Sequence, residues 1–180
     1  MLPPYLEGGA FYTAMKIIFI LFFLVFWLDA PQTSHAAEEQ TVIRAGSIPS
    51  KTANPENFSG RVRTDQNFKS VAPARHYGAT VSFEPGSRTA WHIHPLGQTL
   101  IVTSGRGITQ EWGKKPTVIL PGDIVVCPPG IKHWHGASPN TAMSHIAIGE
   151  AEPGKNAQWF EKLTDEEYGK AAAEAINGAN

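Results

Sequence analysis

Three side chains that could bind a metal ion follow one another closely in an apolar, β-prone stretch. His92 and His94 are one residue apart, and Gln98 follows four residues later. Because successive side chains of a strand point to opposite faces, an extended chain places both imidazoles on one face. A second stretch, from Gly122 to His133, supplies a strand, a rigid Pro-Pro-Gly corner and a further histidine. The two stretches therefore offer candidate ligands for one metal ion.

Their spacing resembles the two signature motifs of the cupin superfamily. The first motif is Gly, five residues, His-x-His, three or four residues, an acid, six residues and Gly. The chain matches it from Gly86 to Gly105, with Gln98 in place of the acid. The second motif is Gly, five residues, Pro-x-Gly, two residues and His, which is matched from Gly122 to His133. The resemblance implies a metal-ligand set of His92, His94, Gln98 and His133. The alternative is a barrel whose inward histidines are only hydrogen-bonded, as in cupins that have lost their metal.

An amide at the acid position changes the electrostatics of such a site. A divalent ion would keep its full double charge, so it should polarise a bound oxygen more strongly and be held less tightly. The substitution also removes a carboxylate that could accept a proton. We expect His145 and His135 to act as general base or acid in its place. The alternative role for both is to orient a ligand or to fill the core.

Apolar and aromatic residues surround these positions. Ala79, Val81 and Phe83 share one face of an expected strand, and Trp134 stands between two of the histidines. We expect these four residues to line a pocket for a small uncharged ligand, aromatic or aliphatic. The alternative is that they only fill the barrel, which is usual for small barrels.

The wider match, from Ala79 to Glu150, resembles one subgroup of small bacterial cupins, the manganese-dependent hydroxynitrile lyases of the (R)-mandelonitrile lyase type. It is most specific at His-x-His-Pro-x-Gly-Gln-Thr and at Lys-His-Trp-His-Gly-Ala. The resemblance implies Mn, with Fe, Zn or Ni as alternatives, and reversible cleavage of a cyanohydrin to an aldehyde and hydrogen cyanide. The metal would act as a Lewis acid on the hydroxyl while a histidine takes the proton. Two other functions would use the same ligands: a Mn or Fe dioxygenase, and a non-catalytic periplasmic protein that binds a metal or a small ligand.

Many short β-prone runs, separated by Pro and Gly turn signals, must position these side chains. Over residues 79–151 they predict an all-β fold, a cupin jelly-roll barrel. Residues 37–78 are polar, with three prolines, and predict an N-terminal arm with room for an edge strand. Residues 152–180 contain strong helix formers. Thr164 and Glu167 form a capping-box pattern, so we expect one or two short C-terminal helices there.

The chain begins with a segment typical of a secretory signal. Lys16 precedes twelve apolar residues, 17–28, which is too few for a helix to cross a hydrocarbon core of about 30 Å. Ser34-His35-Ala36 is a small-x-small cleavage site, so we expect cleavage after Ala36 and export to the periplasm or the medium. The alternative is an uncleaved anchor. Met15 is a more natural start than Met1, which would make residues 1–14 an upstream extension.

The predicted mature chain is electrically neutral. Residues 1–36 hold one of the 15 basic and two of the 16 acidic side chains, so 14 of each remain. A neutral chain lacks the charge that nucleic acid or an anionic membrane would attract, which favours a small-molecule partner. The single cysteine, Cys127, cannot form an intrachain disulfide and is expected to be a buried structural thiol. We therefore expect stability to come from the core and from a homodimer or homotetramer.

Overall fold

The computed structural model describes residues 39–152 and 156–179. The predicted signal sequence, residues 1–36, lies outside the described residues. No helix in the described parts of the chain is both long and apolar enough to cross a membrane. The part of the chain from Val42 onward forms one compact unit, and it holds all the strands and the helix described below.

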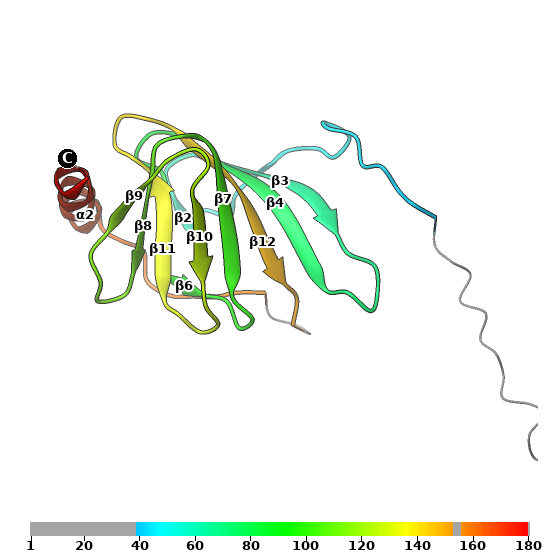
Figure 1. Cartoon of the computed structure of the whole chain (residues 1–180). Helices are drawn as coiled ribbons and strands as arrows, with labels where there is room; N and C mark the ends of the chain where they lie inside the picture. The colour runs from blue at the N-terminus through cyan, green and yellow to red at the C-terminus, as the bar shows by residue number, and fades with distance from the viewer. Residues whose placement is uncertain (1–38, 153–155, 180) are drawn as a thin grey trace, which may run out of the picture. The chain divides into compact units, whose positions relative to one another are not determined.

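Two antiparallel sheets make up the body of this unit (Figure 1). The six-stranded sheet has the order β1-β3-β4-β12-β7-β10. Its strands are β1 (Lys51–Thr52), β3 (Val62–Lys69), β4 (His76–Phe83), β12 (Met143–Glu150), β7 (Gln98–Gly105) and β10 (Ile124–Cys127).

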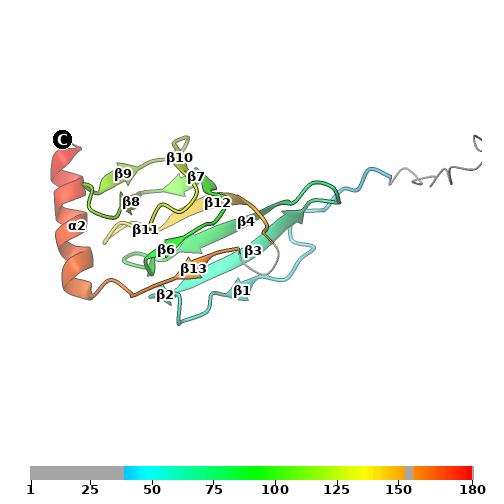
Figure 2. The same ribbon diagram turned by 90° about the horizontal axis from the view of Figure 1, so that it is seen from below.

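The second sheet carries His92, His133 and His135. Its main path runs β13-β6-β11-β5-β2, and β8 pairs with both β11 and β9. Its strands are β13 (Gln158–Trp159), β6 (His92–Ile93), β11 (His133–Ala137), β5 (Arg88–Thr89), β2 (Phe58–Ser59), β8 (Gly107–Glu111) and β9 (Thr117–Ile119). One helix, α2 (Asp165–Gly178), packs beside β9 (Figure 2). The prediction of an all-β barrel with a short C-terminal helix is confirmed.

The core between the sheets follows from alternation along the strands. In β12 every second residue is buried, from Met143 through His145 and Ala147, and in β4 the inward positions include Val81 and Phe83. The apolar ones among these side chains join Leu100 and Val102 of β7 in one cluster. Because the period is two, the same rule that buries the apolar residues also directs His145 inward.

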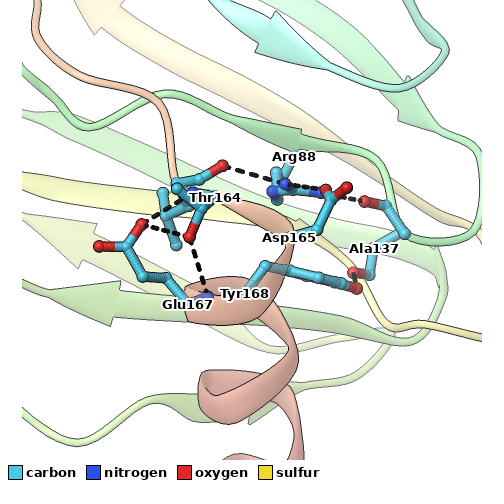
Figure 3. Close-up of polar contacts among 8 residues, drawn as sticks. Arg88, Ala137, Thr164, Asp165, Glu167 and Tyr168 are labelled. Carbon is cyan, nitrogen blue, oxygen red and sulfur yellow. Dashed lines mark hydrogen bonds and ion pairs between the residues drawn. The ribbon is translucent and has the colours of Figure 1, made fainter.

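Helix α2 begins at the capping box that the sequence predicts. The Thr164 hydroxyl accepts a hydrogen bond from the Glu167 N–H (3.1 Å), and the Glu167 carboxylate accepts one from the Thr164 N–H (2.8 Å). The helix is fixed to the barrel by Arg88, which donates to Asp165 (2.7 Å) and stacks on the Tyr168 ring, whose hydroxyl donates to the Ala137 carbonyl (2.7 Å; Figure 3). These contacts attach α2 to β5 and β11.

The predicted arm, residues 37–78, contributes more than an edge strand. It holds β1, β2 and β3, and β3 pairs with β4 along nearly its whole length. Ala53 and Val62 are buried in the core. Strand β4 begins at His76, three residues before the start expected for the barrel core. Val62 is buried, but Arg63 is exposed and Thr64 is half-buried, so the polar sequence of β3 gives little sign of its role in the sheet.

Candidate metal centre

Five histidines of the described chain are buried together inside the barrel. Pairing of β6 with β11 sets His92 opposite His133, and alternation puts His135 on the same face of β11 as His133. Exposed fractions are 1% for His92, 6% for His94, 2% for His133, 3% for His135 and 0% for His145. The rings of His92, His94 and His133 lie together, with ring centres 4.3 to 5.7 Å apart.

Hydrogen bonds set the tautomer of the three predicted histidine ligands. In each ring Nδ1 faces a backbone carbonyl oxygen: His92 that of Ala90 (2.9 Å), His94 that of Asn156 (2.8 Å) and His133 that of Ile131 (2.9 Å). A carbonyl can only accept, so Nδ1 carries the hydrogen and Nε2 keeps its lone pair. This is the arrangement in which a neighbouring carbonyl orients a metal-ligating imidazole.

The surroundings of two of the Nε2 atoms, those of His94 and His133, suit a cation. The buried Nε2 of His94 has no hydrogen-bond partner among the described residues. The Nε2 of His133 lies 3.4 Å from Oε1 of Gln98, and with the hydrogen on Nδ1 both of these atoms are acceptors. Buried acceptors normally have a partner, and a cation bound by all of them would supply one. The donor set of imidazole nitrogens and an amide oxygen therefore fits a divalent transition metal.

His135, which was predicted to act as a base, lies next to the predicted ligands His92 and His133. One ligand nitrogen from each of His92, His133 and His135 can be chosen so that all three lie within 4.8 Å of one another. His135 is thus within reach of the same ion as the predicted ligands. The signal was present in the sequence, since His133 and His135 share a strand face.

His145 lies beside His135 and deeper in the core. Its ring centre is 4.9 Å from that of His135 and 5.6 Å from that of Phe83. Neither of its nitrogens has a hydrogen-bond partner in the described part of the chain. This position, next to the ligand cluster but outside the group of three, suits proton transfer better than ligation.

Burial keeps the whole cluster uncharged. Loss of hydration lowers the pKa of His94 and of His145 to about 4, and the pKa of His133 is lowered as well. Burial, reinforced by the neighbouring imidazoles, holds the pKa of His92 and His135 well below the usual value. Neutral imidazoles are the form that binds a metal or accepts a proton.

Comparison with known proteins identifies the family. Residues 79–149 match the family model described as a cupin domain. Over 125 residues the chain is 54% identical to a protein named (R)-mandelonitrile lyase from Granulicella tundricola, an alignment that spans 69% of this chain and 95% of that protein. The chain belongs to the cupin family.

Solved structures agree with this assignment. The cupin is similar to a cupin-like protein from Thermotoga maritima, with a TM-score of 0.63 and 37% identity over 73% of this chain and 97% of that one. It also resembles a cupin-2 domain from Rhodospirillum rubrum, with a TM-score of 0.56 and 18% identity over 78% and 92% of the two chains. The second likeness concerns the fold alone.

Only some of the four predicted pocket residues lie near the histidines of this cupin. Phe83 contacts His135 and His145 edge-on or tilted, and Val81 is buried beside it. Ala79, farther along β4, is partly exposed and helps to line a cavity of about 530 Å³ that also reaches Asn156. Three of the four predicted pocket residues therefore lie along one strand that leads from this cavity to the histidines.

Trp134, the fourth predicted pocket residue, lies elsewhere. It falls between His133 and His135 on β11, so its side chain points to the opposite face. Its ring packs 5.9 Å from that of Tyr168 on α2, and its Nε1 donates to Gln110 (2.8 Å). Trp134 is part of the cluster between barrel and helix, outside the histidine-lined interior.

Two further rings, those of Trp159 and Phe58, extend the aromatic surroundings of the histidines. Trp159 of β13 lies 4.6 Å from His92, and Phe58 of β2 lies 5.5 Å from Trp159 and 6.2 Å from Phe83. Together Phe58, Phe83 and Trp159 form what we call the aromatic wall.

Cys127 is buried as expected, and burial raises the pKa of its thiol to about 11.

Without metal, this cupin should lose stability between about pH 6.5 and pH 4. An unfolded histidine has a pKa near 6.5, whereas burial lowers that of folded His94 and His145 to about 4. In this window the unfolded chain binds more protons, so the free energy of unfolding falls as the pH falls, by about 3 kcal/mol for each such group. Urea unfolding of chelator-treated protein across this window measures the effect. A flat profile would contradict it.

Proposed function

We propose that this cupin is a metal-dependent lyase that cleaves and forms cyanohydrins, and that (R)-mandelonitrile is a substrate. The observation that carries the proposal is the set of three imidazoles whose Nδ1 hydrogens are held by carbonyls, which leaves the lone pair of each Nε2 available to a metal ion. The reaction is suggested by the 54% identity to a protein named (R)-mandelonitrile lyase.

His92, His94, Gln98 and His133 would hold the ion, for which we propose Mn(II). When bound, the ion supplies Lewis-acid chemistry that lowers the pKa of the cyanohydrin hydroxyl. Three neutral imidazoles and an amide leave the charge of the ion uncompensated, which strengthens this effect. His135 has a ring nitrogen within 4.8 Å of nitrogens of His92 and His133, so it would lie next to the ion.

His145 and His135 would handle the proton. Each is neutral because of burial, so either imidazole can take the hydroxyl proton of the cyanohydrin. The bond between the carbinol carbon and the nitrile carbon then breaks, the oxygen becomes the aldehyde carbonyl, and cyanide leaves with the electron pair. The imidazolium returns its proton to cyanide, and no oxidant or reductant is needed.

The aromatic wall would bind the rest of the substrate. Phe83 lies beside His135 and Trp159 beside His92, and Phe58 contacts both of these rings. Aromatic pairs prefer offset or edge-to-face contacts, and such a wall suits a benzaldehyde-like group. The neutral interior disfavours a charged substrate.

The test is cleavage of (R)-mandelonitrile, followed as benzaldehyde release. Mature protein reconstituted with Mn(II) should release benzaldehyde well above the buffer rate. The same protein stripped with chelator should return to that rate and recover on re-addition of Mn(II). No release despite bound metal would overturn the lyase proposal and favour a dioxygenase, to be checked by oxygen uptake, or a binding function.

We also propose that the mature chain is exported and forms a homodimer or homotetramer. One row on the outer face of the six-stranded sheet aligns Ile124, Ile101 and Ile146 across three strands. Ile124 is 62% exposed, and Val126 beside it is 68% exposed. Such an apolar patch on a sheet is typical of a protein interface. Sedimentation of the mature chain tests the assembly, and a monomer would refute it.

A further inference from the structure

A cage of three aromatic rings surrounds the ammonium group of Lys132. Its Nζ lies 3.7 Å from the ring centre of Trp112, 5.0 Å from that of Phe160 and 5.6 Å from that of Trp91. The same Nζ forms an ion pair with Glu161. A lysine held by several ring faces and one carboxylate is more firmly placed than an ordinary surface lysine.

The cage lies directly behind the metal centre. His92 pairs with His133 on one side and with Trp159 on the other, so these three residues form one row across β11, β6 and β13. Side chains alternate between faces, so the next residues along point outward. Each member of the row has a cage residue as its neighbour: Lys132 before His133, Trp91 before His92 and Phe160 after Trp159.

Residues 156–161, which we call the strap, reach the metal centre at two points. The carbonyl oxygen of Asn156 accepts the Nδ1 hydrogen of His94. The ring of Trp159 lies over that of His92, with an angle of 31° between them. Two of the proposed ligands are therefore oriented in part by the strap, which is separate in sequence from the strands that carry them.

The strap is held to the barrel by the pairing of β13 with β6 and by two flanking backbone hydrogen bonds. The Phe160 N–H donates to the Trp91 carbonyl (2.9 Å), and the Trp91 N–H donates to the Glu161 carbonyl (3.0 Å). Glu161 and Phe160 are exposed on their outer sides. Lys132 contacts both side chains, and it does so from the residue next to His133.

We propose that Lys132 is a positioning residue of the metal centre. Its ammonium group holds the strap against the barrel through Phe160 and Glu161, a contact that we call the latch, and thereby fixes the orientation of His92 and His94. The inference rests on the proposed function only in taking these histidines as ligands. Lys132 itself touches neither the ion nor the substrate. Partners that orient ligands typically contribute 10- to 100-fold to metal affinity, so an effect of about tenfold is expected here.

Metal affinity is the first measurement. Lys132→Met keeps the length of the side chain and removes its charge, and it should weaken Mn(II) binding about tenfold in calorimetry. Lys132→Arg keeps a cation that can stack on the rings and should restore most of the affinity. The matched control is Lys170→Met, which removes the lysine of the exposed Lys170–Glu166 pair on α2 and should leave binding unchanged.

Hydrogen exchange of the metal-free protein is the second measurement. Loss of the latch should speed amide exchange in the strap of Lys132→Met but not of Lys170→Met. Unchanged exchange would refute the latch, and faster exchange with unchanged affinity would refute its positioning role. A wild-type protein that binds no Mn(II) would instead refute the proposed function, while the exchange comparison would still decide whether the latch exists.

Discussion

The His133→Ala variant should lose metal binding almost completely. His133 lies close to two other proposed ligands: its Nε2 is 3.4 Å from Oε1 of Gln98, and one of its nitrogens lies within 4.8 Å of a nitrogen of His92. Removing a partner that only orients a ligand costs 10- to 100-fold in affinity. Deleting a ligand should exceed this, with a loss on the order of 100-fold or more, and cyanohydrin cleavage should fall with it.

Equilibrium dialysis with Mn(II), followed by metal analysis, measures the loss. His76→Ala is the matched control, because His76 is exposed and lies in the other sheet. His133→Gln keeps a polar side chain of similar reach and guards against a general packing defect. Full metal occupancy in His133→Ala, with the fold intact, would show that the ion binds elsewhere.

The candidate ligands could be predicted because their positions depend on local geometry. His92 and His94 share a face by alternation alone, and the turn at Pro128-Pro129-Gly130 sets where β11 begins and hence where His133 points. The start of α2 was equally local, since Thr164 and Glu167 make their reciprocal bonds within one turn.

Contacts made by segments distant in the sequence were not predictable in this way. Trp159 reaches His92 only because β13 adds to the edge of β6, and Phe58 joins the wall through β2. The carbonyl of Asn156 that orients His94 has no signature at all, since every residue carries one. Trp134 was misplaced for a different reason. It is next to His133 and His135 in the sequence, but alternation along the strand turns its side chain to the opposite face.

The His145→Ala variant should keep its metal and lose most of its rate. Both nitrogens of this fully buried imidazole lack a partner among the described residues, and burying an unpaired polar group costs about 1–3 kcal/mol. A side chain that stabilises nothing through hydrogen bonds is best explained by its chemistry. General base catalysis is worth about 10²- to 10⁴-fold, so kcat for (R)-mandelonitrile should fall by that order while Mn(II) affinity stays near wild type.

Met143→Leu is the matched control, because Met143 is another fully buried inward residue of the same strand, two positions away. It repacks the core at conserved volume and should leave kcat nearly unchanged. If His145→Ala keeps its rate, the base is His135, whose ring centre lies 4.9 Å from that of His145 and which is not among the proposed ligands. If His145→Ala loses its metal instead, the ion lies closer to His145 than a site formed by the Nε2 atoms of His92, His94 and His133 would place it. His145 is fully buried, so its truncation also leaves a cavity, and a thermal melt of the variant checks that either result comes from folded protein.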